Sequence, residues 1–160
     1  ILGWRYFHHP LMQYEVISSS SDQNSGIAVL RVEDARDQSF RVVRLLEFLP
    51  TKNNEKILAA AIASYVIDKK AAFLDFFCGS DTFIQQYMPS PFVQQSDHQQ
   101  YFFPRMFQPL EWRERHSINA SFRQAKESGV SELNINDVYF TKGDPSQDIL
   151  LNREYVTKLL

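Results

Sequence analysis

Three side chains in this sequence combine a reactive group with a position where it could act. Glu47 lies near the end of a predicted strand and could accept a proton from an amine, directly or through water; on a solvent-facing side it would be only a surface charge. Cys78 follows a predicted strand and precedes Gly79, which could expose a nucleophile, although a buried structural thiol is the alternative. Tyr87 carries a phenol whose reference pKa of about 10 is close to that of a thiol.

The histidines and the single cysteine form no metal-binding pattern. His8 and His9 are adjacent, so their side chains point to different sides of the backbone. His98 and His116 lack the spacing of metal ligands. One cysteine excludes an internal disulfide and any multi-cysteine metal site. A lone cysteine is compatible with a reducing compartment, so we expect a cytoplasmic protein without a metal site.

Composition narrows the class of protein further. The chain has 160 residues, 44% of them hydrophobic, which predicts one globular domain spanning 1–160. A formal net charge of −2 predicts no nucleic-acid partner, and no apolar run approaches the ~20 residues that span a bilayer. The sequence opens Ile1-Leu2-Gly3 without an initiator methionine, so we expect an N-terminal portion to be missing. The oligomeric state stays open.

The elements that must position these side chains follow from periodicity and turn residues. Alternating stretches separated by short polar loops predict strands near 12–18, 26–34 and 40–49, joined as an antiparallel meander. Apolar residues at three- and four-residue spacing predict a helix over 53–68. A strand at 72–77 must then run parallel to 40–49, because a helical crossover returns the chain in the same direction.

The second half of the chain is less regular. A short helix is predicted over 82–88. Beyond it, the pattern predicts an interrupted strand at 101–107, a helix at 118–128, a last strand at 138–141 and a tail at 154–160. The fold class is therefore α/β or α+β, with a mixed sheet in which the meander is followed by a parallel β-α-β unit.

The order of strand, helix, strand and short helix resembles the central half of the GCN5-related N-acetyltransferases. In that family, a strand ending in proline leads into a phosphate-binding turn patterned Gln/Arg-x-x-Gly-x-Gly/Ala. Counted from Pro50, the first position falls on Asn53 and the glycine positions on Lys56 and Leu58. We expect Leu58 to crowd a phosphate, and lysine charge to replace the missing amide contacts. The resemblance implies acetyl-CoA or another acyl-CoA as cofactor, contacted by Leu49, Thr51, Lys52, Asn53 and Lys56.

The next segment resembles the family's Asn-x-x-Ala-x-x-x-Tyr-x-x-x-Gly-Phe helix. Tyr87 lies five residues before Phe92, Ser80 stands at the asparagine position, and Pro91 replaces the glycine. The resemblance implies that Tyr87 protonates the departing thiolate. Glu47, on the strand beside the presumed acyl site, would serve as the base or hold a water molecule. The alternative for Tyr87 is that it only packs under the sheet.

Two flanking stretches are similar to uncharacterised acetyltransferase-like proteins, some of which accompany surface-polysaccharide biosynthesis. The first stretch is Trp4-Arg5-Tyr6 with His9-Pro10 and Tyr14, and the second is Thr141-Lys142-Gly143-Asp144 with Gln147, Asp148 and Asn152. For the second, an Asp-Pro turn with solvated carboxylates is the alternative.

Two functions follow from these observations. The first is an acyltransferase-like enzyme that moves an acyl group from CoA to an amine, such as an amino sugar, as its small-molecule substrate. The alternative is a non-catalytic binding or structural domain that kept the fold and lost the cofactor. For the first function we expect strands 40–49 and 72–77 to diverge where the first ends, leaving a cleft between them.

Overall fold

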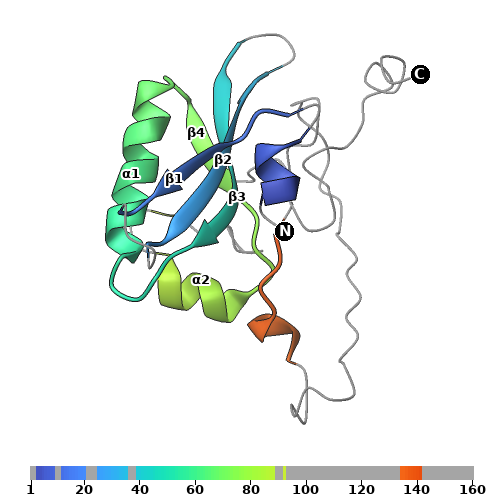
Figure 1. Ribbon diagram of the computed structural model, residues 1–160, viewed down its shortest axis with the longest axis vertical. Helices are drawn as coiled ribbons and strands as arrows, with labels where there is room; N and C mark the ends of the chain where they lie inside the picture. The colour runs from blue at the N-terminus through green and yellow to red at the C-terminus, as the bar shows by residue number, and fades with distance from the viewer. Residues whose placement is uncertain are drawn as a thin grey trace, which may run out of the picture.

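The computed structural model describes residues 3–9, 12–20, 25–35, 39–88, 92 and 134–141. These residues form a mixed α+β arrangement around one sheet (Figure 1). In chain order the elements are the π-helical turn η1 (Gly3–Phe7), β1 (Glu15–Ser18), β2 (Ile27–Asp34), β3 (Arg41–Leu49), α1 (Glu55–Asp68), β4 (Phe73–Phe76), α2 (Asp81–Tyr87) and the 3-10 turn η2 (Ile135–Asp137). The elements predicted at 101–107, 118–128 and 154–160 lie outside the described residues, as does the family-like stretch 142–152.

The sheet confirms the predicted topology. Its strand order is β1-β2-β3-β4, with β1 to β3 antiparallel and β4 parallel to β3. The helix α1 is the crossover that a parallel pair requires. The strand predicted at 138–141 is wrong, because only Thr141 pairs there, in a single antiparallel bridge with Cys78.

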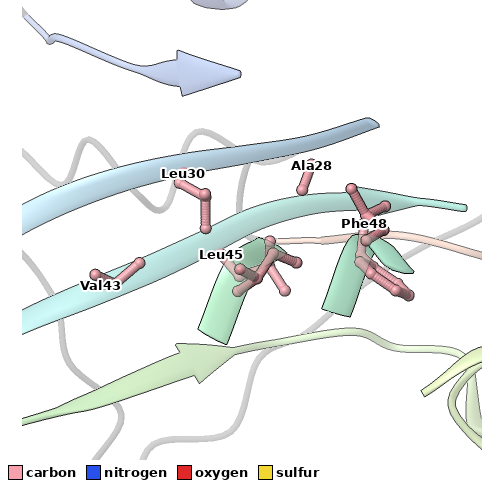
Figure 2. Packing of buried hydrophobic residues seen from close by; sticks show 7 residues of the cluster. Ala28, Leu30, Val43, Leu45 and Phe48 are labelled. Carbon is pink, nitrogen blue, oxygen red and sulfur yellow. The ribbon is translucent and has the colours of Figure 1, made fainter. Parts of the chain in front are cut away.

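The main core lies between the sheet and α1. Leu58 and Ile62 of α1 are buried against five residues of β2 and β3, namely Ala28, Leu30, Val43, Leu45 and Phe48 (Figure 2). The turn η1 lies on the other side of the sheet from α1 (Figure 1), where Tyr6 packs on Val29 and Leu46. The two faces of the sheet are therefore covered by different parts of the chain.

A bulge in β3 sets the direction of the residues near its end. Val29 pairs with Glu47 while Leu30 pairs with Leu45, so Leu46 is an extra residue opposite β2. An extra residue interrupts the alternation of side chains along a strand. Leu45 and Phe48 both reach the α1 side, whereas Leu46 joins the cluster on the η1 side. The bulge thereby turns Glu47 away from the apolar core.

Candidate functional site

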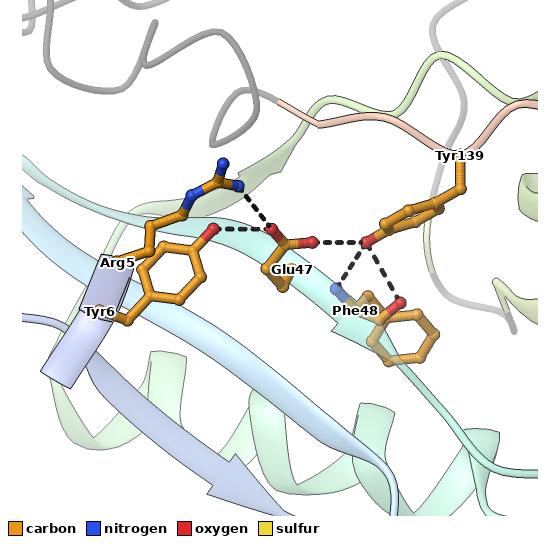
Figure 3. A network of polar contacts seen from close by, with 5 residues as sticks. All are labelled: Arg5, Tyr6, Glu47, Phe48 and Tyr139. Carbon is orange, nitrogen blue, oxygen red and sulfur yellow. Dashed lines mark hydrogen bonds and ion pairs between the residues drawn. The ribbon is translucent and has the colours of Figure 1, made fainter. Parts of the chain in front are cut away.

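Glu47 is buried, with 5% of its surface exposed, so its interpretation as a surface charge is wrong. The hydroxyl of Tyr6 donates to Oε1 at 2.6 Å, and the hydroxyl of Tyr139 donates to Oε2 at 3.1 Å. Nη1 of Arg5 lies 3.9 Å from Oε1. Figure 3 shows the carboxylate between the two phenols, which come from opposite ends of the described chain. Burial of a carboxylate costs free energy unless such donors offset the loss of water.

Tyr6 is fixed by packing on the η1 side of the sheet. Its side chain is buried in a cluster with Val29 and Leu46. The ring of Tyr14 meets it edge to face, with centroids 5.0 Å apart. These contacts leave the Tyr6 ring little freedom, so its hydroxyl is held at Glu47.

Two side-chain contacts from α2 hold the segment that carries Tyr139. The hydroxyl of Ser80 donates to the carbonyl oxygen of Asn136 at 2.7 Å and also accepts from Phe83 N–H, which caps α2. The hydroxyl of Thr82 donates to Oδ1 of Asp137 at 2.7 Å. Ser80 stands at the asparagine position of the family-like helix, and here its role is to cap α2 and hold η2.

The segment is also fixed on its other side, next to the chain that leaves β4. Gly79 N–H donates to the carbonyl oxygen of Phe140 at 2.9 Å. A Cβ atom at Gly79 would lie 1.7 Å from the Phe140 ring, so only glycine permits this approach. The ring of Tyr139 packs on that of Phe83, with centroids 4.6 Å apart. Tyr139 is thus placed by contacts before it, after it and along its ring.

Beyond Leu45, β3 has lost its parallel partner. Pairing between β3 and β4 ends at Leu45 and Phe76, although β3 continues to Leu49 and stays paired with β2. At this edge, Phe48 N–H donates to the Tyr139 hydroxyl oxygen at 3.1 Å. The same hydroxyl lies 3.4 Å from the carbonyl oxygen of Phe48. The loss of pairing agrees with the predicted divergence of the two strands, but it begins at Leu45 and not at the end of β3. The Tyr139 side chain lies against this edge, and the predicted cleft stays a prediction.

Both phenols at Glu47 stay protonated around neutral pH. Burial raises the pKa of Tyr6 well above its ordinary value, and the Glu47 carboxylate raises it further, against the opposing effect of Arg5. Burial is also the main reason that the pKa of Tyr139 is raised, and Glu47 again adds to it, while the hydrogen bond with Phe48 opposes the rise. Each phenol therefore serves Glu47 as a hydrogen-bond donor.

The structure does not bring Tyr87 to Glu47. Tyr87 is half-buried at the end of α2 and packs against the core on the α1 side of the sheet. Its ring lies 5.0 Å from that of Phe83, measured between centroids. The Phe83 ring also packs on the Tyr139 ring, so the contacts described between Tyr87 and the Glu47 site are contacts between aromatic rings.

The turn expected to bind phosphate spans residues 51–54. Asn54 N–H donates to the carbonyl oxygen of Thr51 at 3.0 Å, and Asn53 has a φ of 71°, which asparagine tolerates better than most residues. Because a left-handed residue cannot continue a helix, α1 begins at Glu55 rather than at 53. The Glu55 carboxylate accepts from Asn53 N–H at 3.1 Å. The Glu55 carboxylate, an anion of the protein itself, thus already accepts a hydrogen bond from one amide of this turn.

The other predicted cofactor contacts differ in exposure. Lys52 and Lys56 are exposed, while Leu49 and Thr51 are half-buried. Leu58 does not crowd this turn, because its side chain is buried in the core. The expectation that Leu58 obstructs a phosphate is therefore wrong, because its side chain lies between α1 and the sheet.

A pair of buried arginines lies on the same two strands, at positions to which the sequence reading gave no function. Nε of Arg44 lies 2.7 Å from Oε2 of Glu33, and Nη2 of Arg31 lies 3.3 Å from the same oxygen. Burial raises the pKa of Glu33 despite the opposing charges of both arginines. Arg31 also lies over the ring of Tyr14. Glu33 therefore offsets part of the charge of the two arginines within the sheet.

The remaining reactive groups stay apart. Burial raises the pKa of the Cys78 thiol, which agrees with a structural thiol and not with an activated nucleophile. Nδ1 of His9 accepts from Met12 N–H at 3.0 Å. In the part of the chain that the structure describes, no three histidine, cysteine or acidic side chains gather as metal ligands would. Across those same residues, no helix combines the length and apolar character needed to cross a bilayer.

Tyr6 and Tyr139 are the site residues that sequence reasoning missed. In the sequence, Tyr6 belongs to the family-like stretch Trp4-Arg5-Tyr6, and Tyr139 belongs to a predicted strand. No spacing rule connects either tyrosine with Glu47, from which they are separated by 41 and 92 positions. Comparison of the chain with protein-family models, with curated proteins and with solved structures gave no match.

Proposed function

We propose that this protein is acyltransferase-like and transfers an acyl group from acetyl-CoA or another acyl-CoA to an amine, such as that of an amino sugar. One observation carries the proposal: the β3–β4 ladder ends at Leu45, and the open edge that follows lies beside the buried carboxylate of Glu47. An extended ligand arm with amides can pair with such an edge as an added strand would. A carboxylate next to that arm can accept the proton that an attacking amine must lose.

The residues at this edge fit the amide-bearing arm better than they fit the phosphates. Phe48 offers both its N–H and its carbonyl on the open side of β3, as their contacts with Tyr139 reveal. At the turn over 51–54, by contrast, Glu55 binds one amide, and the positive charge comes from the exposed Lys52 and Lys56. The bound cofactor would supply an acyl thioester and a thiol leaving group.

In this proposal, Glu47 accepts the proton of the amine and Tyr87 donates a proton to the departing thiolate. The two hydroxyls on Glu47 orient its carboxylate, because each carboxylate oxygen accepts one of them. Lys52 and Lys56 attract the phosphates as point charges, which do not require a glycine turn.

A second candidate function is a binding or structural domain that no longer uses the cofactor. It is favoured by the hydrogen bond from Asn53 N–H to Glu55, which places a negative charge where the phosphates of CoA would bind. Under this alternative, the carboxylate of Glu47 and its two phenols only join η1 and the 134–141 segment to the sheet.

Calorimetric titration with acetyl-CoA distinguishes the two candidates. The transferase proposal expects saturable heat, and thiol release when amino sugars are added as acceptors. Acetyl-CoA that gives no binding heat and no thiol release at millimolar concentration would leave the non-catalytic domain as the function.

A further inference from the structure

Tyr139 makes contacts with β3 that a neighbouring strand would otherwise make. Phe48 N–H donates to its hydroxyl oxygen at 3.1 Å, and the same hydroxyl lies 3.4 Å from the carbonyl oxygen of Phe48. Both main-chain groups lie beyond Leu45, where the pairing with β4 ends. A side chain, and not a backbone, therefore meets this part of the β3 edge (Figure 3).

One phenol hydroxyl cannot satisfy the N–H and the carbonyl of Phe48 as fully as two ligand amides can. A hydroxyl has a single proton, so Tyr139 shares its proton between the carbonyl of Phe48 and the carboxylate of Glu47. The contact with Glu47 is the shorter, at 3.1 Å against 3.4 Å. A ligand with two successive amides would bring a separate acceptor for Phe48 N–H and a separate donor for its carbonyl. Such a ligand gains a hydrogen bond that Tyr139 makes only weakly.

The backbone on both sides of Tyr139 is fixed by contacts that do not involve the Tyr139 side chain. The segment is held before Tyr139 by the contact of Ser80 with Asn136, and after it by the contact of Gly79 with Phe140. Between these anchors, the hydroxyl is held by Glu47 and Phe48 alone among the contacts described. Displacing the side chain therefore has to break these hydroxyl contacts and the packing of the ring on Phe83, while the two anchors keep the backbone in place.

We propose that Tyr139 is an internal competitor for the acyl-CoA arm: its hydroxyl closes the β3 edge until a diamide ligand displaces it. Displacement removes the Tyr139 hydrogen bond from Oε2 of Glu47, and a carboxylate that loses a hydrogen-bond donor becomes a stronger base. This inference rests on the proposed function and adds to it a coupling between cofactor binding and the basicity of the Glu47 carboxylate. A protein whose competent state is only partly populated binds its ligand correspondingly more weakly.

Pantetheine tests the competition, because it carries two amides and no phosphate. Tyr139→Phe removes the hydroxyl and keeps the ring on Phe83, so this variant should bind pantetheine roughly fivefold more tightly than the unmodified chain, the equivalent of one ordinary hydrogen bond. Tyr65→Phe is the matched control, since Tyr65 packs on the α1 side of the core. The affinity of this variant for pantetheine should equal that of the unmodified chain. Equal or weaker binding by Tyr139→Phe overturns the proposal.

A second measurement needs no variant. In the unmodified chain, pantetheine should shift the amide resonance of Phe48, and an unchanged resonance at saturation would contradict displacement at this edge.

Acetyl-CoA binding, measured in parallel, separates this inference from the proposed function. If pantetheine binds Tyr139→Phe more tightly while acetyl-CoA binds neither protein, the competition stands and the transferase function fails. If acetyl-CoA and pantetheine bind both proteins equally, the function stands and the competition fails.

Discussion

The phenol oxygen of Tyr6 lies 2.6 Å from Oε1 of Glu47, which joins a helical turn near the start of the described chain to the third strand of the sheet. Tyr139 makes the matching contact with Oε2. Because the carboxylate is almost fully buried, its charge depends on donors of this kind. Glu47 and its two phenols therefore form one unit, and a change in one member should alter the behaviour of the others.

Replacing Glu47 by glutamine tests whether the carboxylate is needed for acyl transfer in a chain that still folds. The amide has nearly the same shape and can still accept from Tyr6, but it cannot take a proton from an amine. We expect Glu47→Gln to remain folded and to lose acyl transfer at least about 100-fold, measured as thiol release. The control is Glu15→Gln, an exposed carboxylate on β1 that pairs with Lys69 and should leave the rate unchanged. Full activity in Glu47→Gln would remove this residue from the mechanism.

The raised pKa values of Tyr6 and Tyr139 predict a loss of stability at alkaline pH. Because the folded-state pKa lies above the unfolded value of about 10, the folded chain keeps protons that the unfolded chain releases. Stability is thus fully present below pH 10 and falls as pH rises toward the folded-state pKa values, by up to about 1.4 kcal/mol per pH unit for each tyrosine. Urea midpoints between pH 8 and 11 measure this slope.

Tyr6→Phe isolates the contribution of one phenol. At neutral pH the variant should be less stable by roughly 1–3 kcal/mol, because a hydrogen bond to a charged group is lost. Above pH 10 its stability should decline less steeply than that of the unmodified chain. An identical alkaline slope in both proteins would mean that Tyr6 titrates normally.

The order of the elements could be predicted because it follows from local patterns. Polar turns and alternation marked the three antiparallel strands, and the helical crossover fixed the parallel direction of β4. The burial of Glu47 could not be predicted in this way. Simple alternation places position 47 with Val43 and Leu45 on the core side, and only the extra residue Leu46 turns the carboxylate to the other face.

The hydrogen-bond partners of Glu47 could not be predicted from the sequence for a different reason. Tyr139 reaches the site because Ser80 and Thr82 hold η2 against α2, and each of these contacts spans more than fifty positions. Contacts at that separation depend on tertiary packing, which no local periodicity records. The start of α1 was misjudged by two residues because Asn53 is left-handed. The obstruction expected from Leu58 came from counting the family's turn onto a residue whose side chain belongs to the core.

The corrected position of Leu58 gives a stability prediction. Its side chain is fully buried between α1 and the sheet, so Leu58→Ala should leave a cavity and lower the free energy of unfolding by about 2–5 kcal/mol. The neighbouring Ile57 is 54% exposed, and Ile57→Ala should cost less than about 1 kcal/mol. Urea denaturation of both variants measures the difference. Equal losses would mean that α1 presents another face to the sheet.

The charges around the 51–54 turn should govern the affinity for the phosphate part of acyl-CoA. Lys52 and Lys56 are exposed, so Lys52→Ala and Lys56→Ala should each weaken acetyl-CoA binding by only about twofold to fivefold. Binding should also weaken with added salt, because exposed charges are screened over roughly 8 Å at physiological ionic strength. Calorimetric titrations at low and high salt measure both effects.

Glu55→Gln provides the opposite change at the same turn. The carboxylate that accepts from Asn53 N–H would repel a phosphate, so its neutral replacement should tighten acetyl-CoA binding and leave the affinity for uncharged pantetheine unaltered. Glu15→Gln again serves as control, because it removes an equal charge from β1. If Glu55→Gln weakened acetyl-CoA binding, the phosphates would have to bind elsewhere on the protein. The same would follow if the lysine variants bound acetyl-CoA as tightly as the unmodified chain and added salt did not weaken that binding.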